Sequence, residues 1–323
     1  MKLPAEFDLH ALHVFVMTVE LGGMSQCASH LQITQSAVSQ TIAKLEASIG
    51  ASLFDRTTRP LGLTASGKSL FERGRTLTAM ARSAYDEVRE GANLPIASIT
   101  LAMSFSLANQ LTAPILNRLG ARADRWSIRS GISQAHHSDF LARDIDILVT
   151  GSFNLEHRDQ VQLYPVFDES FVVAFPANYD GPTDLADEVP ALPFIRFTRL
   201  SGMGQQIERQ IVRMKLKLPH SVEVDSAHQQ VAAVASGFGW TITSPVCLAA
   251  EPGLLARLRL HPMPRARFSR RVQVVARSNE LGDLPKAIAD LSTQVLRDST
   301  FPPLVAVYPW IAQELVWPSA SIA

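Results

Sequence analysis

Residues 24–49 read MSQCASHLQITQSAVSQTIAKLEASI, and this stretch decides the fold of the N-terminal part of the chain. It predicts a short helix over 24–31, a turn, and a longer helix over 35–49 with Thr34 as its N-cap. The longer helix places apolar side chains on one face at Val38, Ile42, Leu45 and Ile49. Small side chains that let two short helices meet lie at Cys27, Ala28 and Ala37. This pattern predicts a helix-turn-helix.

The outward face of the longer helix carries short or amide side chains, which can reach base edges from a helix that enters the major groove. A small hairpin follows over 53–63, and its polar tip offers contacts to phosphates or to the minor groove. The expected DNA-binding residues are Thr34, Gln35, Ser36, Ser39, Gln40, Lys44, Arg56, Thr57 and Arg59.

Charge distribution supports this interpretation locally. The whole chain has 30 basic and 30 acidic residues and no formal net charge. Residues 22–82, however, contain seven basic and three acidic side chains, a local net charge of +4. A local field of this sign attracts the DNA backbone. Without the hairpin and this charge, a small helical packing module with a solvated polar face would fit equally well.

Two further helices flank this region. One is expected over 9–21, and a long one over 64–90. The long helix has a heptad seam at Leu70, Gly74, Leu77, Ala81, Ala84 and Val88. Such a seam indicates a dimer. The alternative is a helix packed on its own hairpin or on the C-terminal domain.

From residue 98 onward, strands alternate with helices in two successive blocks, which predicts an α/β architecture with two lobes around a cleft. Ligands of open α/β sheets lie at the carboxyl ends of strands, and helix N-termini attract anions. These two rules, together with arginines near such a segment that could pair with a carboxylate, give the candidate effector-binding residues: Ser104, Phe105, Ser106, Ser152, Arg196, Arg199, Ser201, Gly202, Met203, Ser226 and Thr243. For each serine the alternative is ordinary helix capping.

A run of residues then matches a known pattern in order: Ala28-x-x-Leu31-x-x-Thr34-Gln35-Ser36-Ala37-Val38-Ser39-x-x-Ile42-x-x-Leu45-Glu46. The match continues through Leu53-Phe54-Asp55-Arg56 and Leu63-Thr64-x-x-Gly67. It resembles the N-terminal signature of LysR-type transcriptional regulators over about the first 90 residues. The remainder is similar to the family only in layout and length. One departure is Gly23-Met24-Ser25-Gln26-Cys27-Ala28, where the family often has Ser-Phe-Thr-x-Ala-Ala.

The resemblance implies a domain plan. Residues 1–63 would form a winged helix-turn-helix, 64–91 a linker and dimerisation helix, and 95–300 a two-lobed domain like a periplasmic binding protein. Lobe I would comprise about 95–166 and 265–300, and lobe II about 167–264. Residues 301–323 would form a C-terminal extension.

The resemblance also implies a homodimer, assembled further into a homotetramer, on a pseudo-palindromic operator of double-stranded DNA, with RNA polymerase as a further partner. The leading hypothesis is a transcriptional regulator controlled by a small effector, an organic anion, bound between the lobes. Two alternatives stay open: a regulator without an effector, and a small-molecule binding protein with an incidental helical module.

Other classes of function lack their motifs. The sequence has no nucleotide loop or nucleophile elbow, so we expect no enzyme and no cofactor. His136-His137-x-Asp139 has no further ligand cluster, and no metal site is expected. The two cysteines, Cys27 and Cys247, are interpreted as core residues of a cytoplasmic protein. No membrane span or signal segment is expected.

Overall fold

Helices α1 (Leu9–Glu20), α2 (Met24–Leu31) and α3 (Gln35–Ile49) open the chain in the computed structural model. The structure describes residues 7–55, 62–91, 95–151, 161–185, 190–218, 222–263, 267–278 and 280–318. The bounds agree with the expected helices to within one residue. Two compact units can be separated, one over Met1–Val88 with Leu141–Asp144 and one over Arg89–Phe140 with Ile145–Ala323. Each unit is described by itself.

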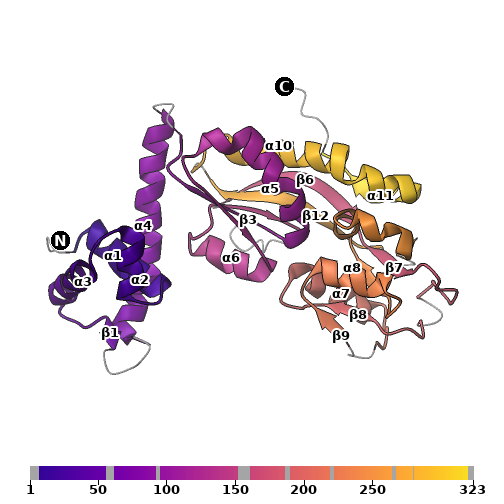
Figure 1. Cartoon of the computed structure of the whole chain (residues 1–323), viewed down its shortest axis with the longest axis horizontal. Helices are drawn as coiled ribbons and strands as arrows, with labels where there is room; N and C mark the ends of the chain where they lie inside the picture. The colour runs from indigo at the N-terminus through magenta and orange to yellow at the C-terminus, as the bar shows by residue number, and fades with distance from the viewer. Residues whose placement is uncertain are drawn as a thin grey trace. The chain divides into compact units, whose positions relative to one another are not determined.

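The helices of the first unit gather into a small bundle (Figure 1), and their facing side chains form a small apolar core. Strands β1 (Phe54–Asp55) and β2 (Gly62–Leu63) pair antiparallel and precede the long helix α4 (Ala65–Gly91). Phe15 and Phe54 meet edge to face, with ring centroids 5.4 Å apart. Cys27 is fully buried in this core, as expected of a structural thiol.

Several residues of the N-terminal signature hold the hairpin on the helices. The Glu46 carboxylate accepts hydrogen bonds from the backbone N–H groups of Leu53 and Phe54, at 2.7 and 3.3 Å. The Thr64 hydroxyl accepts the N–H of Gly67 at 3.0 Å and so caps α4. A Cβ atom on Gly67 would lie 2.0 Å from the carbonyl oxygen of Leu53, so only glycine fits. These positions therefore specify the attachment of the hairpin.

The heptad seam of α4 divides into two parts. Leu70 packs against the core of the first unit, and a Cβ on Gly74 would meet side chains of Leu12 and Val16 in α1. Further along the helix, Leu77 and Val88 are exposed. The start of the seam thus packs on α1 and the core of its own unit, a partner that neither interpretation named, and its later part carries exposed apolar side chains.

The second unit confirms the expected α/β architecture. Its larger sheet has the order β13-β6-β12-β5-β3-β4. The strands are β3 (Ile99–Met103), β4 (Trp126–Ser130), β5 (Ile147–Thr150), β6 (Val161–Ser170), β12 (Ser269–Arg277) and β13 (Leu315–Val316). The helices that follow or cover them are α5 (Phe105–Leu119), α6 (Ser133–Leu141) and α10 (Leu284–Val295) (Figure 1). We call this part the first lobe.

A second lobe is built on two smaller sheets. One has the order β10-β7-β11, the other pairs β8 with β9 in parallel, and a bridge between Phe194 and Trp240 joins them. The strands are β7 (Val172–Pro176), β8 (Ile195–Phe197), β9 (Val222–Val224), β10 (Thr241–Thr243) and β11 (Leu258–Pro262). The helices are α7 (Gly202–Arg213), α8 (Ala227–Ala235) and α9 (Pro245–Ala249).

The two lobes are joined by neighbouring strands. The chain enters the second lobe at the end of β6 and returns through β12, and these two strands pair antiparallel along their length. The backbone N–H of Phe171 donates to the carbonyl of Phe268 at 3.0 Å at the point of crossing. Strands β6 and β11 were not anticipated from the sequence, because their apolar pattern is interrupted by prolines and charged residues.

The C-terminal segment packs on the second unit. Helix α11 (Pro302–Val307) is followed by a 3₁₀ turn (Pro309–Glu314) and by β13, which pairs with β6. Phe301 and Ile311 are buried, and the ring of Trp317 lies against Phe167 with centroids 5.5 Å apart. The Tyr308 hydroxyl donates to the carbonyl of Leu258 at 2.5 Å. This segment therefore contacts elements of both lobes.

Candidate DNA-recognition surface and ligand cavity

Helix α3 presents a polar face opposite its buried one. Val38, Ile42 and Leu45 are buried, whereas Gln35, Ser36, Gln40 and Lys44 are exposed and Ser39 is half-buried. Thr34 has a different task, because its hydroxyl accepts the N–H of Ala37 at 3.2 Å and contacts the Ser36 hydroxyl at 2.9 Å. The exposed amides and hydroxyls are thus available at the N-terminal end of the helix. The expected residues of the hairpin tip, Arg56, Thr57 and Arg59, lie outside the described residues.

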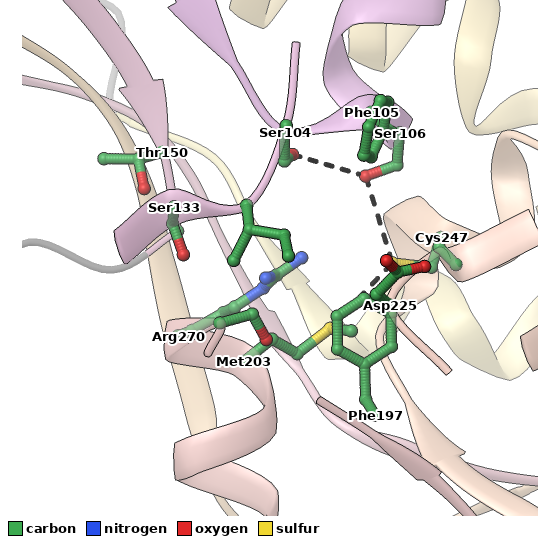
Figure 2. A pocket seen from close by; sticks show the side chains of 15 residues that line it. Ser104, Phe105, Ser106, Ser133, Thr150, Phe197, Met203, Asp225, Cys247 and Arg270 are labelled. Carbon is green, nitrogen blue, oxygen red and sulfur yellow. Dashed lines mark hydrogen bonds between the residues drawn. The ribbon is translucent and has the colours of Figure 1, made fainter. Parts of the chain in front are cut away.

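A cavity lies between the two lobes of the second unit, with an empty volume of about 510 Å³ that includes space open to solvent (Figure 2). Its walls come from the ends of β3, β5, β8 and β9 and from the starts of α5, α6 and α7. Strand ends and helix starts meet here because β3 and β4 of the first lobe lead into α5 and α6, and β8 and β9 of the second lobe lead into α7 and α8. The lining residues are Ser104, Phe105, Ser106, Gly131, Ile132, Ser133, Thr150, Gly151, Phe197, Ser201, Met203, Asp225, Ala227, Cys247 and Arg270.

Contacts across the cavity link the two lobes. The backbone N–H of Gly202 in the second lobe donates to the hydroxyl of Ser133 in the first, at 3.0 Å. The sulfur of Cys247 lies 3.9 Å from the Ser106 hydroxyl and 3.9 Å from the sulfur of Met203 (Figure 2). These contacts hold the lobes close together on both sides of the cavity.

Arg270 is the basic residue of the cavity wall. Its side chain is 9% exposed and forms a buried ion pair with Glu169, which is fully buried. Arg270 Nη2 also donates to the Ser244 hydroxyl at 2.8 Å, and the second carboxylate oxygen of Glu169 accepts the N–H of Val246 at 2.8 Å. Burial lowers the pKa of Arg270, but Glu169 and Cys247 raise that pKa more, so the guanidinium keeps its charge.

Five of the expected effector-binding residues line this cavity, namely Ser104, Phe105, Ser106, Ser201 and Met203. Ser201 also caps α7, since its hydroxyl accepts the N–H of Gly204 at 2.9 Å. Gly202 is close, but its N–H is already bonded to Ser133. Gly204 allows α7 to pack closely against the backbone of Thr198, because a Cβ at this position would lie 2.0 Å from the Thr198 carbonyl oxygen. Its lack of a side chain is explained by this packing and not by the approach of a ligand.

The other expected residues lie elsewhere. Arg196 and Arg199 both pair with Glu208, and Arg196 also donates to the carbonyl of Leu218 at 2.8 Å. Their charge is used within the second lobe, so their expected role at the cavity is not supported by their position. Thr243 is fully buried in β10 and Ser226 lines a neighbouring surface groove. Ser152 lies outside the described residues.

Sequence reasoning missed Phe197, Thr150, Asp225, Cys247 and Arg270. The first three stand at or directly after strand ends, and the same rule that selected Ser104 could have selected them. Arg270 and Cys247 carry no such signal, because β12 returns from the second lobe and α9 follows a strand of that lobe. Only the folded chain brings these two residues to the cavity.

A helix-turn-helix with an attached hairpin, and a two-lobed α/β domain with a cavity between its lobes, together define a DNA-binding regulator that carries a substrate-binding domain. The profile described as "Bacterial regulatory helix-turn-helix protein, lysR family" matches residues 9–68. The profile "LysR substrate binding domain" matches residues 92–297. The chain belongs to the LysR family of transcriptional regulators, as the N-terminal signature indicated.

Individual relatives agree with this placement. The HTH-type transcriptional repressor PA14_22550 of Pseudomonas aeruginosa (strain UCBPP-PA14) is 25% identical over 273 residues, which cover 81% of this chain and 83% of that protein. The structure of a full-length OxyR variant from Pseudomonas aeruginosa matches with a TM-score of 0.67 at 18% identity, over 92% of this chain and 97% of that one. Full-length CbnR, solved with its target DNA, matches with a TM-score of 0.59 at 17% identity, over 90% and 100% of the two chains.

Members of this family are transcriptional regulators rather than enzymes, and they bind DNA. Among the described residues, no helix has both the length and the apolar character needed to cross a membrane. No group of three or more metal-ligating side chains occurs within the described ranges either.

Proposed function

We propose that this regulator is controlled by a small organic effector with an anionic group, bound in the cavity between the lobes. The observation that carries this proposal is Arg270, a buried guanidinium that lines the cavity beside three helix N-termini. Helices α5, α6 and α7 all begin at this cavity, with Ser104, Ser133 and Ser201 among the lining residues. Helix N-termini carry unpaired N–H groups and partial positive charge, and both favour an anion.

Ligand binding would act through the joint between the lobes. Strands β6 and β12 connect them, and the contacts from Ser106 and Ser133 to the second lobe close the cavity. A ligand that binds the closed arrangement more tightly than the open one shifts the balance between them. We propose that this shift changes the geometry of the assembled regulator and thereby its contacts to DNA.

For DNA, we propose that Gln35, Ser36, Ser39 and Gln40 contact base edges and that Lys44, Arg56, Thr57 and Arg59 contact the backbone. Exposed apolar residues on the later part of α4, such as Leu77 and Val88, support a homodimer, and with it a pseudo-palindromic operator. We propose further that the dimers assemble into a homotetramer, that the regulator contacts RNA polymerase, and that it acts in the cytoplasm.

DNA readout is tested by finding the operator in a genome-wide footprint and measuring affinities for it and for unrelated DNA by gel shift. Gln35→Ala and Ser39→Ala should cost about 1–3 kcal/mol on the operator and little on unrelated DNA. Lys44→Ala is the matched control on the same helix: it should weaken both and reduce the salt dependence by about one charge. Equal losses on both DNAs for Gln35→Ala would contradict the assignment.

Effector binding is tested by thermal unfolding with a panel of small organic acids, because a ligand that binds only the folded protein raises its Tm. Ser104→Ala should abolish the shift, since Ser104 lines the cavity and makes no side-chain capping bond. Ser138→Ala, on the surface of α6, is the control and should leave the shift intact. If no acid raises the Tm, the alternative of a regulator without an effector is favoured.

A further inference from the structure

We propose that the effector is dipolar: it carries a cationic ammonium group for Asp225 as well as an anionic group for Arg270. This inference rests on the proposed effector function and names the class of molecule that the cavity accepts. Among the lining residues, Arg270 and Asp225 are the two charged side chains. Figure 2 shows the guanidinium of Arg270 and the carboxylate of Asp225 pointing into the cavity from different walls.

Arg270 does not leave a net positive charge in the cavity. Its charge is balanced by Glu169, whose carboxylate lies 2.8 Å from both Nε and Nη2 of Arg270. One nitrogen, Nη1, has no hydrogen-bond partner among the described residues and is held beside Gly151, where an added Cβ would lie 2.9 Å from it. Arg270 therefore offers a fixed donor to an anionic group, but the pair as a whole is neutral.

Asp225 has no such balance. It follows β9 directly, is exposed, and makes no ion pair or hydrogen bond with a described residue. The Glu251 carboxylate, in the groove next to the cavity, lies 2.9 Å from His228 Nδ1 and forms an ion pair with it when the imidazole is protonated. The charged side chains of the cavity wall, counted together with Glu169, thus sum to one negative charge, at Asp225.

This sum decides the class of ligand. A plain carboxylate would bring a second negative charge into a cavity that already holds one, and like charges in a partly desolvated site repel. A molecule with both a carboxylate and an ammonium group would pair with Arg270 Nη1 and the helix N-termini at one end, and with Asp225 at the other. Its net charge is zero, so the bound site keeps the charge that it has when empty.

Apolar side chains from both lobes also line the cavity, namely Phe105, Ile132, Phe197 and Met203. These side chains suit a short hydrocarbon chain between the two charged groups. Hydroxyl groups of Ser104, Ser106 and Thr150 can bind either end, so they do not by themselves choose between an acid and an amino acid. The class that fits is the small amino acids with a carbon chain between ammonium and carboxylate.

Calorimetry and thermal unfolding of the full-length protein test this with matched series. The amino acids are glycine, β-alanine, 4-aminobutanoate and 5-aminopentanoate; each is paired with the carboxylate and with the amine of the same chain length. At least one amino acid should bind about tenfold or more tightly than its matched carboxylate and amine. Asp225→Asn should weaken that amino acid about tenfold and strengthen the matched carboxylate, an opposite pair of changes that a purely structural role would not give.

Asp180→Asn, an exposed acid of the same lobe outside the cavity wall, is the control and should change neither affinity. Tighter binding of carboxylates than of amino acids, unaffected by Asp225→Asn, overturns the dipolar ligand and leaves the proposed anionic effector standing. Binding of amines alone also overturns it. If no member of any series and no acid of the wider panel binds, the effector proposal fails together with this inference.

Discussion

Arg270 Nε donates to Glu169 Oε1 at 2.8 Å, and Nη2 of the same guanidinium lies 2.8 Å from the same oxygen. The two residues belong to β12 and β6, the strands that connect the lobes; the Glu169 side chain is fully buried and that of Arg270 is 9% exposed. One buried ion pair thus joins the connecting strands to the wall of the ligand cavity. Glu169 also accepts the N–H of Val246, and Arg270 also donates to the Ser244 hydroxyl. These two hydrogen bonds connect the ion pair to the start of α9.

Glu169→Ala should lower the free energy of unfolding by about 3–5 kcal/mol, because it leaves Arg270 charged and unpaired in the interior. Urea denaturation measures this. Asp168→Ala is the control on the same strand: Asp168 pairs with Arg271 at 2.7 Å at the exposed surface, where a pair contributes about 0–1 kcal/mol. Equal losses for the two variants would show that the buried pair has no special weight.

Gly67→Ala should destabilise the first unit by several kcal/mol or prevent its folding, because the new methyl would overlap the carbonyl of Leu53. Ser66→Ala replaces the neighbouring exposed residue in the same helical turn and should change stability by only about 0.5 kcal/mol. Thermal unfolding by circular dichroism compares them. A Gly67→Ala protein as stable as Ser66→Ala would contradict the close approach of α4 to the hairpin.

Ile311→Ala should cost about 2–5 kcal/mol, since Ile311 is fully buried in the C-terminal segment. Val307 on the same segment is 51% exposed, and Val307→Ala should cost far less. Chemical denaturation of both variants measures the difference. If both substitutions were neutral, the segment after Thr300 would contribute nothing to the stability of the second unit.

Acidification should destabilise the protein through His136. Burial lowers the pKa of His136 in the folded state, Arg129 lowers it further, and Asp139 opposes them. A group whose folded pKa is lowered binds more protons when unfolded, so its stabilising effect is present above pH 6.5 and is lost as the pH falls toward the folded pKa. Unfolding measured between pH 7.5 and 5.5 should show a shallower loss for His136→Gln than for the natural protein.

His13 and His261 also have pKa values lowered by burial, so the His136→Gln protein should keep part of the slope. A slope identical in the two proteins would mean that His136 titrates alike in the folded and unfolded states.

The DNA-recognition helix could be predicted from sequence because its determinants are local. Thr34 caps the helix through Ala37, three residues away, and Val38, Ile42 and Leu45 define its buried face by helical spacing. The hairpin contacts from Glu46 to Leu53 and Phe54 also join residues close in the chain. Short-range order of this kind is visible as periodicity and as capping residues.

The ligand cavity could be predicted only in part. Ser104 and Ser201 could be selected from the sequence because each lies between an expected strand and an expected helix. The structure places both in the cavity wall. The structure places the expected anion-binding residues Arg196 and Arg199 outside the cavity wall, where both pair with Glu208 on α7. The sequence position of an arginine does not reveal whether its guanidinium forms an ion pair with a carboxylate elsewhere in the folded chain.

By itself, the sequence determined the helix-turn-helix and the alternation of strands and helices, since both follow from spacing within short windows. Tertiary structure alone decided that Arg270 and Asp225 face one cavity, and that Glu169 cancels the charge of the first. Pairing between strands far apart in the chain brings these groups together, and no local pattern records such pairing. Charge balance in the cavity, and with it the class of effector, is therefore a property of the folded chain.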